Sequence, residues 1–435
     1  AERVNIGFLD IEVNSLQEVG GKMIDGGFPE PMSAEFPITA ICQYNTYDKK
    51  YCIFTTAKWS KEKSCLPYKD KVIHVYARDE KELIQKWLKY VEYQYPHVWT
   101  GWNVELFDWP YIINRIKKLF GDSEVKRLSA WGIVEAREGK DNFGNAHTVY
   151  EIVGSSIIDM EDAYKKYRYI PREKYALGYI MKAEFPDDES KRKLEFEEET
   201  HGELYYKNPQ LHTDYCCGDV YCTVQLEEAL QFISLCISLS YSACVNIGDN
   251  FSVTKIWDVK VYKEAEKLGI AIPLKRVQPK QSYPGAYVFD TVNGFHKAII
   301  SEDLTSLYPS NWRFMNCGPE TIVQEPFASK YLTELKRLAG EHQETELYDA
   351  LVKKDLEDYF VNRLKMPEWF TQYLQEHNVV ISPICVFFTT NKQSLMAKLV
   401  TDTFMLRRAH KKAKQVWEKR VEKIKERIHQ LQQQN

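Results

Sequence analysis

Acidic side chains at three places in the chain have the types and spacing that bind divalent metal ions. Asp10 and Glu12 stand two residues apart in FLDIEV, so both carboxylates point to one face of the strand that this segment predicts. Asp108 follows in FDWPYI and Asp219 in YCCGDVYC. Two charges on an otherwise apolar strand are costly to bury unless a cation neutralises them. Four carboxylates can hold two Mg²⁺ or Mn²⁺ ions about 3.5–4 Å apart, an arrangement that hydrolyses phosphate esters.

Three further residues stand close to these acids in sequence. Tyr215 lies one helical turn before Asp219, so its hydroxyl could aim an attacking water. Asn103 and Phe107 come just before the helix predicted from Asp108. Each residue alone also fits an ordinary role, as a strand-end acid, a solvated helix acid or a packing tyrosine. Together, and in this order, the set is specific.

A second, separate acid stands in EDLTSLYPS, residues 302–310. The apolar run 298–300 predicts a strand, and Asp303 lies at its end. A turn of exposed N–H groups beside an acid can hold a Mg²⁺–triphosphate group. The alternative is a structural strand-end acid followed by a core tyrosine, Tyr308.

Two basic residues, Arg407 and Lys411, stand four apart in FMLRRAHKKAK and share one face of a predicted helix. Arginine and lysine are the expected ligands of a triphosphate. Basic residues on a polar helix more often form a solvated face, and only the position of the pair after Asp303 favours a phosphate site.

These motifs together resemble family B DNA polymerases, most closely the replicative polymerases of large tailed bacteriophages. The three acidic motifs resemble the proofreading 3′→5′ exonuclease domain, and TGWNVE-FD-PY is near-diagnostic of that group. YPGAYV at 283–288 is similar to the element thought to link the exonuclease and polymerase sites. EGKDNFGNAHTVYEI at 138–152 predicts a hairpin with its turn at 142–145, similar to the family's primer-separating hairpin.

The resemblance implies a role for each candidate residue. At the exonuclease site it implies catalysis and two-ion binding by Asp10, Glu12, Asp108 and Asp219, catalysis by Tyr215, and substrate contact by Asn103 and Phe107. At the polymerase site it implies that Asp303 is a catalytic Mg²⁺ ligand, with the Leu304 backbone carbonyl beside it. The backbone N–H groups of Ser306 and Leu307 would contact the triphosphate, and Tyr308 would be the steric gate. Arg407 and Lys411 would be the basic pair that binds the triphosphate.

Part of the family's pattern is missing from the sequence. The second polymerase aspartate belongs to a YGDTDS motif, which is absent, and so are the KxxxNxxYG motif and most of the amino-terminal domain. The chain is therefore expected to be a fragment, or one subunit of a split polymerase. The implied partners are a single-stranded 3′ end, primer-template DNA, a dNTP, a complementary polypeptide and a sliding clamp. A non-catalytic half that only assembles with DNA and its complement is the alternative function.

The elements that must position these residues alternate between strand and helix, which predicts an α/β domain. Strands are expected at 4–13, 38–45 and 50–56, a short strand and loop at 98–104, and helices at 79–95, 108–120 and, as one long helix, 218–240. The expected order is a ribonuclease-H-like exonuclease domain at 1–231, a helical segment at 232–274, a partial α+β palm at 275–393 and a helical fingers segment at 394–435. Residues 326–378 read as a charged helical stretch with no identifiable chemistry.

Composition narrows the class of protein. The chain has 435 residues and a net charge of −4. It would therefore have to bind nucleic acid through a local basic surface. Residues 401–435 are such a region, with ten Lys and Arg and four acidic residues. Ten cysteines without zinc spacing predict reduced thiols. No apolar run reaches 18 residues, and the start lacks a signal-peptide pattern. We therefore expect a cytoplasmic protein, in the host cytoplasm if it comes from a bacteriophage, that does not enter a membrane.

Overall fold

The computed structural model describes residues 4–19, 22–140, 146–196, 201–274, 290–304, 306–323, 372, 376, 378–381 and 386–432. The chain divides into two compact units, Ala1–Trp257 and Asp258–Asn435. Of the motifs that the sequence singles out, YPGAYV at 283–288 lies outside the described residues, and so does almost all of 326–378.

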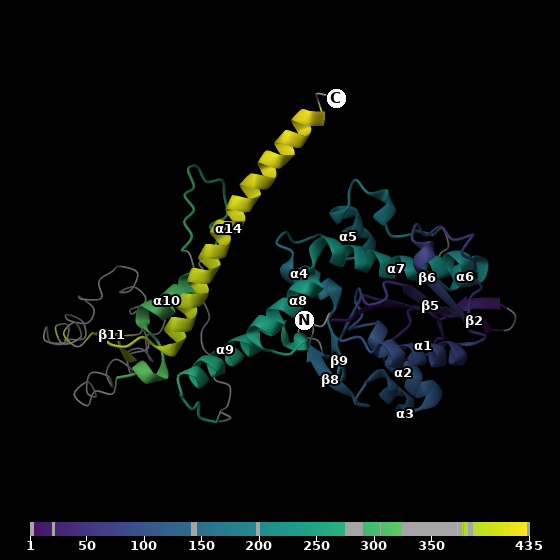
Figure 1. The fold of residues 1–435 in the computed structure, drawn as a ribbon, viewed down its shortest axis with the longest axis horizontal. Coiled ribbons are helices and arrows are strands. Elements are labelled where there is room, and N and C mark those ends of the chain that lie inside the picture. The colour runs from purple at the N-terminus through teal and green to yellow at the C-terminus, as the bar shows by residue number, and fades with distance from the viewer. Residues whose placement is uncertain are drawn as a thin grey trace. The chain divides into compact units, whose positions relative to one another are not determined.

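A six-stranded mixed sheet forms the centre of the first unit (Figure 1). Its order is β10 (Ser156–Ile157), β7 (Val98–Thr100), β1 (Ile6–Val13), β4 (Ile38–Asn45), β5 (Tyr51–Thr55) and β6 (Val72–Tyr76). Strand β1 runs antiparallel to β4 and parallel to β7, and its register against β4 shifts between Glu12 and Val13. The strands predicted at 4–13, 38–45 and 50–56 are confirmed, as is the short strand that begins at Val98.

Helices cover both faces of this sheet, with α7 on one face and α1 and α2 on the other (Figure 1). The helices that contribute to the first unit are α1 (Glu80–Gln94), α2 (Asp108–Phe120), α3 (Asp122–Val125), α4 (Met160–Tyr167), α5 (Leu177–Glu184), α6 (His201–Lys207), α7 (Pro209–Leu230), α8 (Phe232–Ala243) and the first turns of α9 (Val253–Lys267). The helices predicted at 79–95 and 108–120 are confirmed as α1 and α2.

The alternation of side chains along β1 explains this layering. Leu9, Ile11 and Val13 pack into the cluster that holds α1 and α2, whereas Ile6 and Phe8 pack into the cluster that holds α7. Successive strand residues point to opposite faces, so residues 10 and 12 follow residues 6 and 8 toward α7. The strand that builds the core therefore also aims its two acids at α7.

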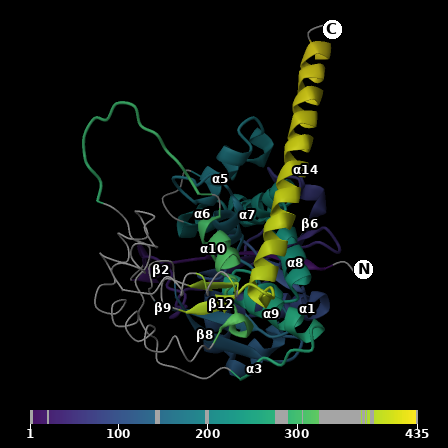
Figure 2. The ribbon, with the colours of Figure 1, turned by 90° about the vertical axis from the view of Figure 1, so that its left-hand side faces the viewer.

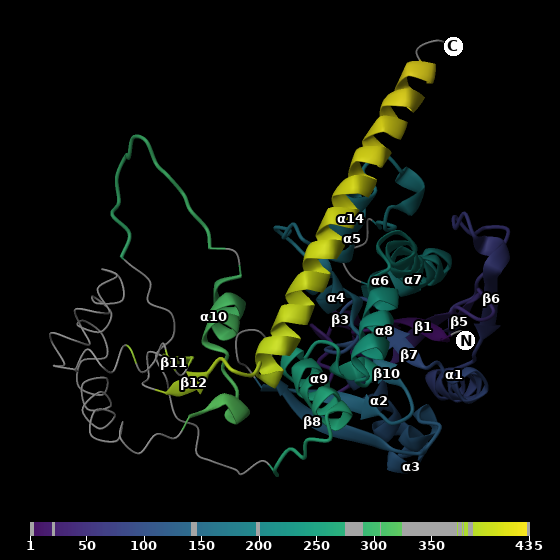
Figure 3. The ribbon, with the colours of Figure 1, turned by 60° about the vertical axis from the view of Figure 1, so that its left-hand side comes forward.

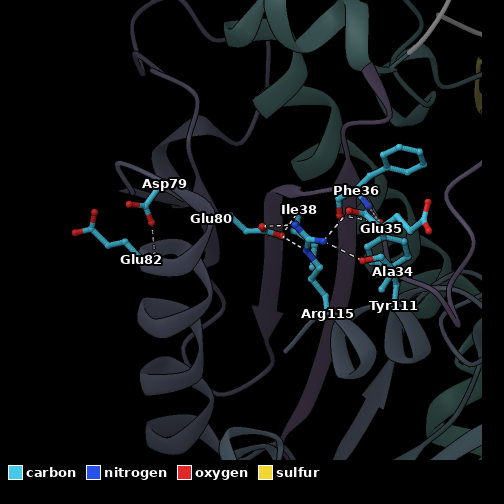
Figure 4. A network of polar contacts seen from close by, with 9 residues as sticks. All are labelled: Ala34, Glu35, Phe36, Ile38, Asp79, Glu80, Glu82, Tyr111 and Arg115. Atoms are coloured by element: carbon cyan, nitrogen blue, oxygen red, sulfur yellow. Dashed lines mark hydrogen bonds and ion pairs between the residues drawn. The ribbon is translucent and has the colours of Figure 1, made fainter. Parts of the chain in front are cut away.

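An ion pair anchors helix α2 (Figure 4). Arg115 donates to both carboxylate oxygens of Glu80 at 2.7 Å and to the carbonyl oxygens of Ala34 and Glu35 at 3.0 and 2.8 Å. Glu80 also accepts from the N–H of Ile38 at 2.7 Å. Arg115 is buried, and these bonds compensate for the loss of its hydration. They tie α2 to the start of α1 and to the loop that enters β4.

The single long helix predicted over 218–240 is wrong: α7 begins earlier, at Pro209, and ends at Leu230. Gln231 has φ 55° and ψ 36°, and α8 starts after it. The carboxylate of Glu227 accepts from the N–H groups of Ile233 and Ser234 at 2.8 and 2.9 Å. A side chain of the first helix thus caps the second, so no glycine or proline is needed at the break.

A hairpin of β8 (Val134–Lys140) and β9 (Ala146–Ile152) is present where the sequence predicts one. The strands pair antiparallel from Val134 with Ile152 to Lys140 with Ala146. The turn expected at 142–145 lies outside the described residues. A second small hairpin joins β2 (Leu16–Val19) and β3 (Lys22–Asp25).

The second unit contains α10 (Leu307–Met315), the pair β11 (Val379–Ile381) and β12 (Phe387–Thr389), and α14 (Leu395–Gln432). Figure 3 shows α10 beside the first turns of α14, which continues well beyond it, and Figure 2 shows α14 as one uninterrupted helix. Asn316 joins these parts, because its amide donates to the carbonyls of Thr389 and Lys392 and accepts from the N–H of Ser394.

The strand predicted at 298–300 is absent, since residues 290–304 form no strand. Ile299 and Ile300 are 76% and 86% exposed. A strand needs a neighbour to satisfy its backbone groups, and no described segment pairs with these residues. Asp303 is therefore not held at a strand end in this structure.

Within the described residues, no single helix has both the length and the apolar character to cross a membrane. Only the pair α7 and α8, bent by 57°, passes such a test jointly, by length and composition.

Candidate active site

Two acids and a thiol meet where β1 packs against α7. Ligand atoms of Asp10, Glu12 and Cys216 all lie within 4.8 Å of one another. The Cys216 thiol donates to the Asp10 carbonyl oxygen at 3.7 Å, and burial raises its pKa well above the usual value. Cys216 therefore remains a neutral thiol beside the two carboxylates.

Asp108, the first residue of α2, lies against the end of β1. Its Oδ1 accepts from the N–H of Ile11 at 3.0 Å, and its side chain is almost fully buried. Burial raises the pKa of Asp108 well above its usual value, and nearby Asp159 and Glu12 add to the effect. The carboxylate has thus lost most of its water without gaining a cationic partner.

Asp219, on α7, has a cationic neighbour. Lys193 Nζ lies 2.6 Å from Asp219 Oδ2, while the buried Oδ1 has no hydrogen-bond partner among the described residues. Burial raises the pKa of Asp219 to about 6, although Lys193 lowers it. Burial also opposes the charge of Lys193, but Asp219 and Tyr215 outweigh it and raise the lysine pKa. The unpaired oxygen leaves one position for another donor or cation.

Tyr215 lies one turn before Asp219 on α7, as the sequence predicts. Its ring makes edge contacts with Phe196 and His201, each at 5.2 Å between centroids, and Lys193 Nζ lies 4.7 Å from the ring centre. Burial raises the pKa of its hydroxyl, which therefore stays protonated at neutral pH.

His201 lies on the other side of Glu12. Its Nδ1 is 2.9 Å from Glu12 Oε2. Burial opposes its protonation, but the contact with Glu12 outweighs burial and raises the histidine pKa. Lys193 and His201 thus supply positive charge to two different acids of the cluster.

A cleft of about 470 Å³ opens onto Asp10 and Asp219. Its lining combines charged groups with two aromatic rings and consists of Asp10, Trp102, Asn103, Glu161, Tyr175, Ala176, Leu177, Lys193 and Asp219. An elongated substrate with both charge and flat apolar surface fits such a lining.

The loop between β7 and α2 borders this cleft and holds Asn103 and Phe107. Asp159 fixes the loop, because its carboxylate accepts from the N–H groups of Asn103 and Glu105, both at 3.1 Å. Asn103 has φ 62°, the left-handed conformation that asparagine tolerates. A Cβ at Gly101 would lie 2.4 Å from the Leu9 carbonyl oxygen, so only glycine lets the loop pass β1 this closely.

The structure therefore brings together the first set of predicted residues. Burial raises the pKa of Asp10, with further increments from the charges of Asp219, Asp108 and Glu12, and the charge of Glu12 also raises the pKa values of Asp108 and Asp219. Such mutually repelling, desolvated carboxylates fit hard divalent cations, whose charge would relieve the repulsion. Phe107 lies at the start of α2, with its ring 5.7 Å from that of Tyr111 and 5.8 Å from that of Phe28.

Sequence reasoning missed Lys193, His201, Asp159 and Cys216. Lys193 lies in a charged stretch, KRKLEF, in which nothing marks one lysine, and His201 begins a short polar helix. Only Asp159, at the end of the run SSIID, carries a usable signal, an acid directly after a short strand and before a helix.

In the second unit the predicted polymerase residues are partly assembled. Asp303, Leu304 and Tyr308 are exposed. Ser306, with φ 56°, precedes the first residue of α10, Leu307, so the N–H groups expected to contact phosphate belong to a helix start.

Helix α14 carries the basic pair of the same unit. Arg407 Nη1 donates to Ser306 Oγ at 3.1 Å. Arg407 and Lys411 line a hollow of about 370 Å³ together with Phe404, Arg408, Lys412 and Gln415. The hollow is therefore basic and has one aromatic wall.

Two family models of known proteins match large parts of the chain. Residues 3–180 match the family described as DNA polymerase family B, exonuclease domain, and residues 256–435 match DNA polymerase family B. The chain belongs to DNA polymerase family B. It spans the exonuclease domain and part of the polymerase domain of that family.

The family B chain is similar to bacteriophage proteins. It is 33% identical over 340 residues to the DNA-directed DNA polymerase of Escherichia phage RB69, an alignment covering 74% of this chain and 36% of that protein. The DNA-directed DNA polymerase of Enterobacteria phage T4 is 32% identical over 314 residues, covering 68% and 34%. The chain thus spans about a third of the length of these relatives.

A solved structure has the same fold. The family B DNA polymerase of Pyrobaculum calidifontis aligns with 95% of this chain and 43% of its own, at a TM-score of 0.55 and 19% identity. This agreement supports the α/β exonuclease fold followed by palm and fingers segments. The boundaries at 231, 274 and 393 remain predictions.

Proposed function

We propose that the chain is a 3′→5′ exonuclease that removes nucleotides from a single-stranded DNA end. The observation that carries the proposal is that four carboxylates from β1, α2 and α7 lie close together, that Asp10 and Asp219 line one cleft, and that Asp219 Oδ1 has no hydrogen-bond partner among the described residues. Asp10, Glu12, Asp108 and Asp219 would hold two divalent cations, Mg²⁺ or Mn²⁺. When bound, these ions would supply the positive charge that favours an ionised water and a departing 3′ oxygen.

The side chains around the acids have separate tasks in this reaction. The protonated Tyr215 hydroxyl orients the water that attacks phosphorus in line with the 3′ oxygen. Lys193 places a fixed positive charge where negative charge grows on the phosphoryl oxygens. Asn103 and Phe107 position the terminal nucleotide. The bond from phosphorus to the 3′ oxygen breaks, and a nucleoside 5′-monophosphate leaves.

The test is the shortening of a 5′-labelled single strand by the wild-type chain with Mg²⁺ and then with chelator. Asp108→Ala and Asp219→Ala should each abolish the metal-dependent shortening. Glu228→Ala is a matched control, since Glu228 is an exposed acid on the same helix as Asp219. Undiminished rates in both aspartate variants would exclude the proposed site.

A second proposal concerns the polymerase residues of the second unit. The contact between Arg407 and Ser306, beside the α10 N-terminus, favours a half-site for a dNTP triphosphate with Mg²⁺. In it Asp303 and the Leu304 carbonyl would hold Mg²⁺, the Ser306 and Leu307 N–H groups and the basic pair Arg407 and Lys411 would contact phosphate, and Tyr308 would exclude a ribose 2′-OH. Nucleotidyl transfer would need a second aspartate from elsewhere.

We propose that this aspartate comes from a complementary polypeptide and that the pair acts on primer-template DNA with a sliding clamp, in the cytoplasm of a bacteriophage host. A primer-extension assay with dNTPs should show shortening without extension for the chain by itself. If the assay shows neither shortening nor extension of the primer, the chain by itself is a non-catalytic half that acts only after assembly with the complementary polypeptide.

A further inference from the structure

A sulfur ligand stands among the carboxylates of the candidate active site. Cys216 comes from α7, and its Sγ lies within 4.8 Å of a carboxylate oxygen of Asp10 and of one of Glu12, both on β1. The hydrolysis proposed above uses oxygen ligands, because Mg²⁺ and Mn²⁺ prefer carboxylate, carbonyl and water oxygens. That reaction makes no use of the thiol, which can bind a different class of metal ion.

Asp219 adds a fourth donor to these three residues. Cys216 and Asp219 stand three residues apart on α7, so they share one face of the helix. The Asp219 side chain is 8% exposed, and its Oδ1 has no hydrogen-bond partner among the described residues. Burial raises the pKa of Cys216 most, and the charges of all three carboxylates raise it further. Asp10 and Asp219 line the same cleft, which gives an ion a path to these donors.

The mixture of ligands selects a thiophilic divalent ion. Zn²⁺ takes four ligands in tetrahedral geometry and accepts cysteine sulfur and carboxylate oxygen together, whereas Mg²⁺ demands octahedral oxygen ligands and keeps several waters. From bonds of about 2.3 Å to sulfur and about 2.0 Å to oxygen, the ligand atoms around zinc stand roughly 3.3–3.5 Å apart. Atoms that already lie within 4.8 Å of one another reach this spacing through small side-chain movements.

Burial does not prevent the Cys216 thiol from binding such an ion. The thiol is neutral in the chain, since burial raises its pKa. A coordinated cation deprotonates a thiol outright, because its charge replaces that of the proton. The proton would pass to solvent as the bond from metal to sulfur forms. The hydrogen bond given up in this step is a long one, 3.7 Å from Cys216 Sγ to the Asp10 carbonyl oxygen.

A thiophilic ion in this position would stop the exonuclease reaction. Catalytic zinc sites keep one position open for water or substrate, whereas sites with four protein ligands are closed. With one thiolate and three carboxylates bound, the ion would have no position left for the attacking water or for a phosphoryl oxygen. The same carboxylates would also be withdrawn from the Mg²⁺ or Mn²⁺ ions that the reaction needs.

We propose that a site for zinc, or another thiophilic divalent ion, inhibits strand shortening, and that its ligands are Cys216, Asp10, Glu12 and Asp219. The inhibition rests on the exonuclease function proposed above, whereas binding of the ion requires no activity. The site and its effect on the reaction can therefore be measured separately.

The absorption of bound cobalt tests the site without any DNA. Co²⁺ replaces Zn²⁺ in sites with sulfur ligands and then gives a sulfur-to-metal charge-transfer band in the near ultraviolet. The full chain should develop this band on titration with Co²⁺, and added Zn²⁺ should remove it. Cys216→Ser replaces the sulfur by an oxygen in a side chain of nearly the same shape and should abolish the band. Cys244→Ser, at an exposed cysteine, is the matched control and should keep it.

Inhibition by zinc then links the site to the reaction. At a fixed Mg²⁺ concentration, the Zn²⁺ concentration that halves the rate is measured for each variant relative to its own rate without zinc. We expect Cys216→Ser to raise this concentration by at least about 10²-fold, since even groups that only orient a metal ligand contribute about 10–100-fold to affinity. Cys216→Ala should behave like the serine variant, and Cys244→Ser like the wild-type chain. Circular dichroism spectra check that each variant is folded.

Three results would overturn the proposal. The first is the absence of the charge-transfer band in the wild-type chain. The second is a band that Cys216→Ser leaves unchanged, which would assign the sulfur ligand to another cysteine. The third is the same half-inhibiting Zn²⁺ concentration for the wild-type chain and Cys216→Ser. If the band depends on Cys216 but Mg²⁺ alone gives no shortening, the metal site stands, and the exonuclease proposal fails together with the inhibition that rests on it.

Discussion

At the scale of single residues, the candidate exonuclease site depends on cations that the chain itself provides. Lys193 compensates Asp219, and His201 compensates Glu12, while Asp10 and Asp108 have no such partner among the described residues. Lys193 thus offsets part of the negative charge of the cluster, and His201 adds to this effect when it is protonated. The carboxylates of Asp10 and Asp108 have no such neighbour in the described part of the chain, so an added divalent cation would relieve the repulsion most at these two groups.

Replacing Lys193 by methionine should slow strand shortening by about 10²–10³-fold, because a positive charge aimed at the reacting phosphate is lost. It should also change the pH profile. Lys193 lowers the pKa of Asp219, so without it that pKa rises above about 6, and the acidic limb of the rate profile moves to higher pH. Rates measured from pH 5 to 9 at saturating Mg²⁺ check both effects, and an unshifted limb would contradict the assigned contact.

His201 should act by positioning Glu12. We expect His201→Ala to raise the Mg²⁺ concentration for half-maximal rate by about 10–100-fold, the usual cost of removing a group that orients a metal ligand. His201→Asn keeps a hydrogen-bond donor and should recover most of that loss. Metal titrations of the two variants distinguish this role from a structural one, for which both would behave alike.

The acids could be predicted from sequence, but their cations could not. Asp10 with Glu12, and Tyr215 with Asp219, stand at spacings that a strand or a helix converts directly into a shared face, and Asp108 begins a helix that the sequence predicts. Lys193 and His201 reach the site through long-range packing, from a stretch whose composition resembles any charged surface. Alternation within one element is local information, whereas a contact across 26 residues, as between Lys193 and Asp219, is not.

At the scale of elements, the sheet and the helices on its faces could be predicted from hydrophobic periodicity. The predictions that are wrong concern places where a contact with another residue or strand determines the structure. The break between α7 and α8 has no glycine or proline because Glu227 caps α8 from within α7. The strand expected at 298–300 is missing because no described strand pairs with it.

Gln231 offers a test of the break. It holds φ 55°, a conformation that costs an L-residue about 1 kcal/mol and glycine almost nothing. Gln231→Gly should therefore leave stability unchanged or raise it slightly, whereas Glu227→Ala should lower it by about 1–2 kcal/mol by removing the cap. Urea unfolding monitored by circular dichroism measures both. A large loss for the glycine variant would show that the Gln231 side chain itself is needed.

At the scale of the whole molecule, the described residues of the two units differ in burial. Both large apolar clusters belong to Ala1–Trp257. In the second unit many large apolar side chains of the described residues are exposed, from Leu274 at 94% to Leu431 at 47%.

Limited digestion with trypsin should therefore cut first after residue 257 and leave a resistant fragment near 1–257. Compact, well-packed units open rarely, whereas exposed chain is cleaved without unfolding. Mass spectrometry of the early products identifies the sites. Early cleavage inside the six-stranded sheet would contradict the assignment of the core to the first unit.

The position of β1 between β4 and β7 limits where insertions and deletions can be tolerated during evolution. Side chains alternate with a period of two, so one residue gained or lost ahead of Asp10 would turn both acids into the opposite layer, among Leu9 and Ile11. Neighbours on both sides hold the strand in register and prevent it from slipping to compensate. Relatives that still cut DNA should therefore vary in residue type along 6–12 but keep its length, with gaps confined to the loops before and after it.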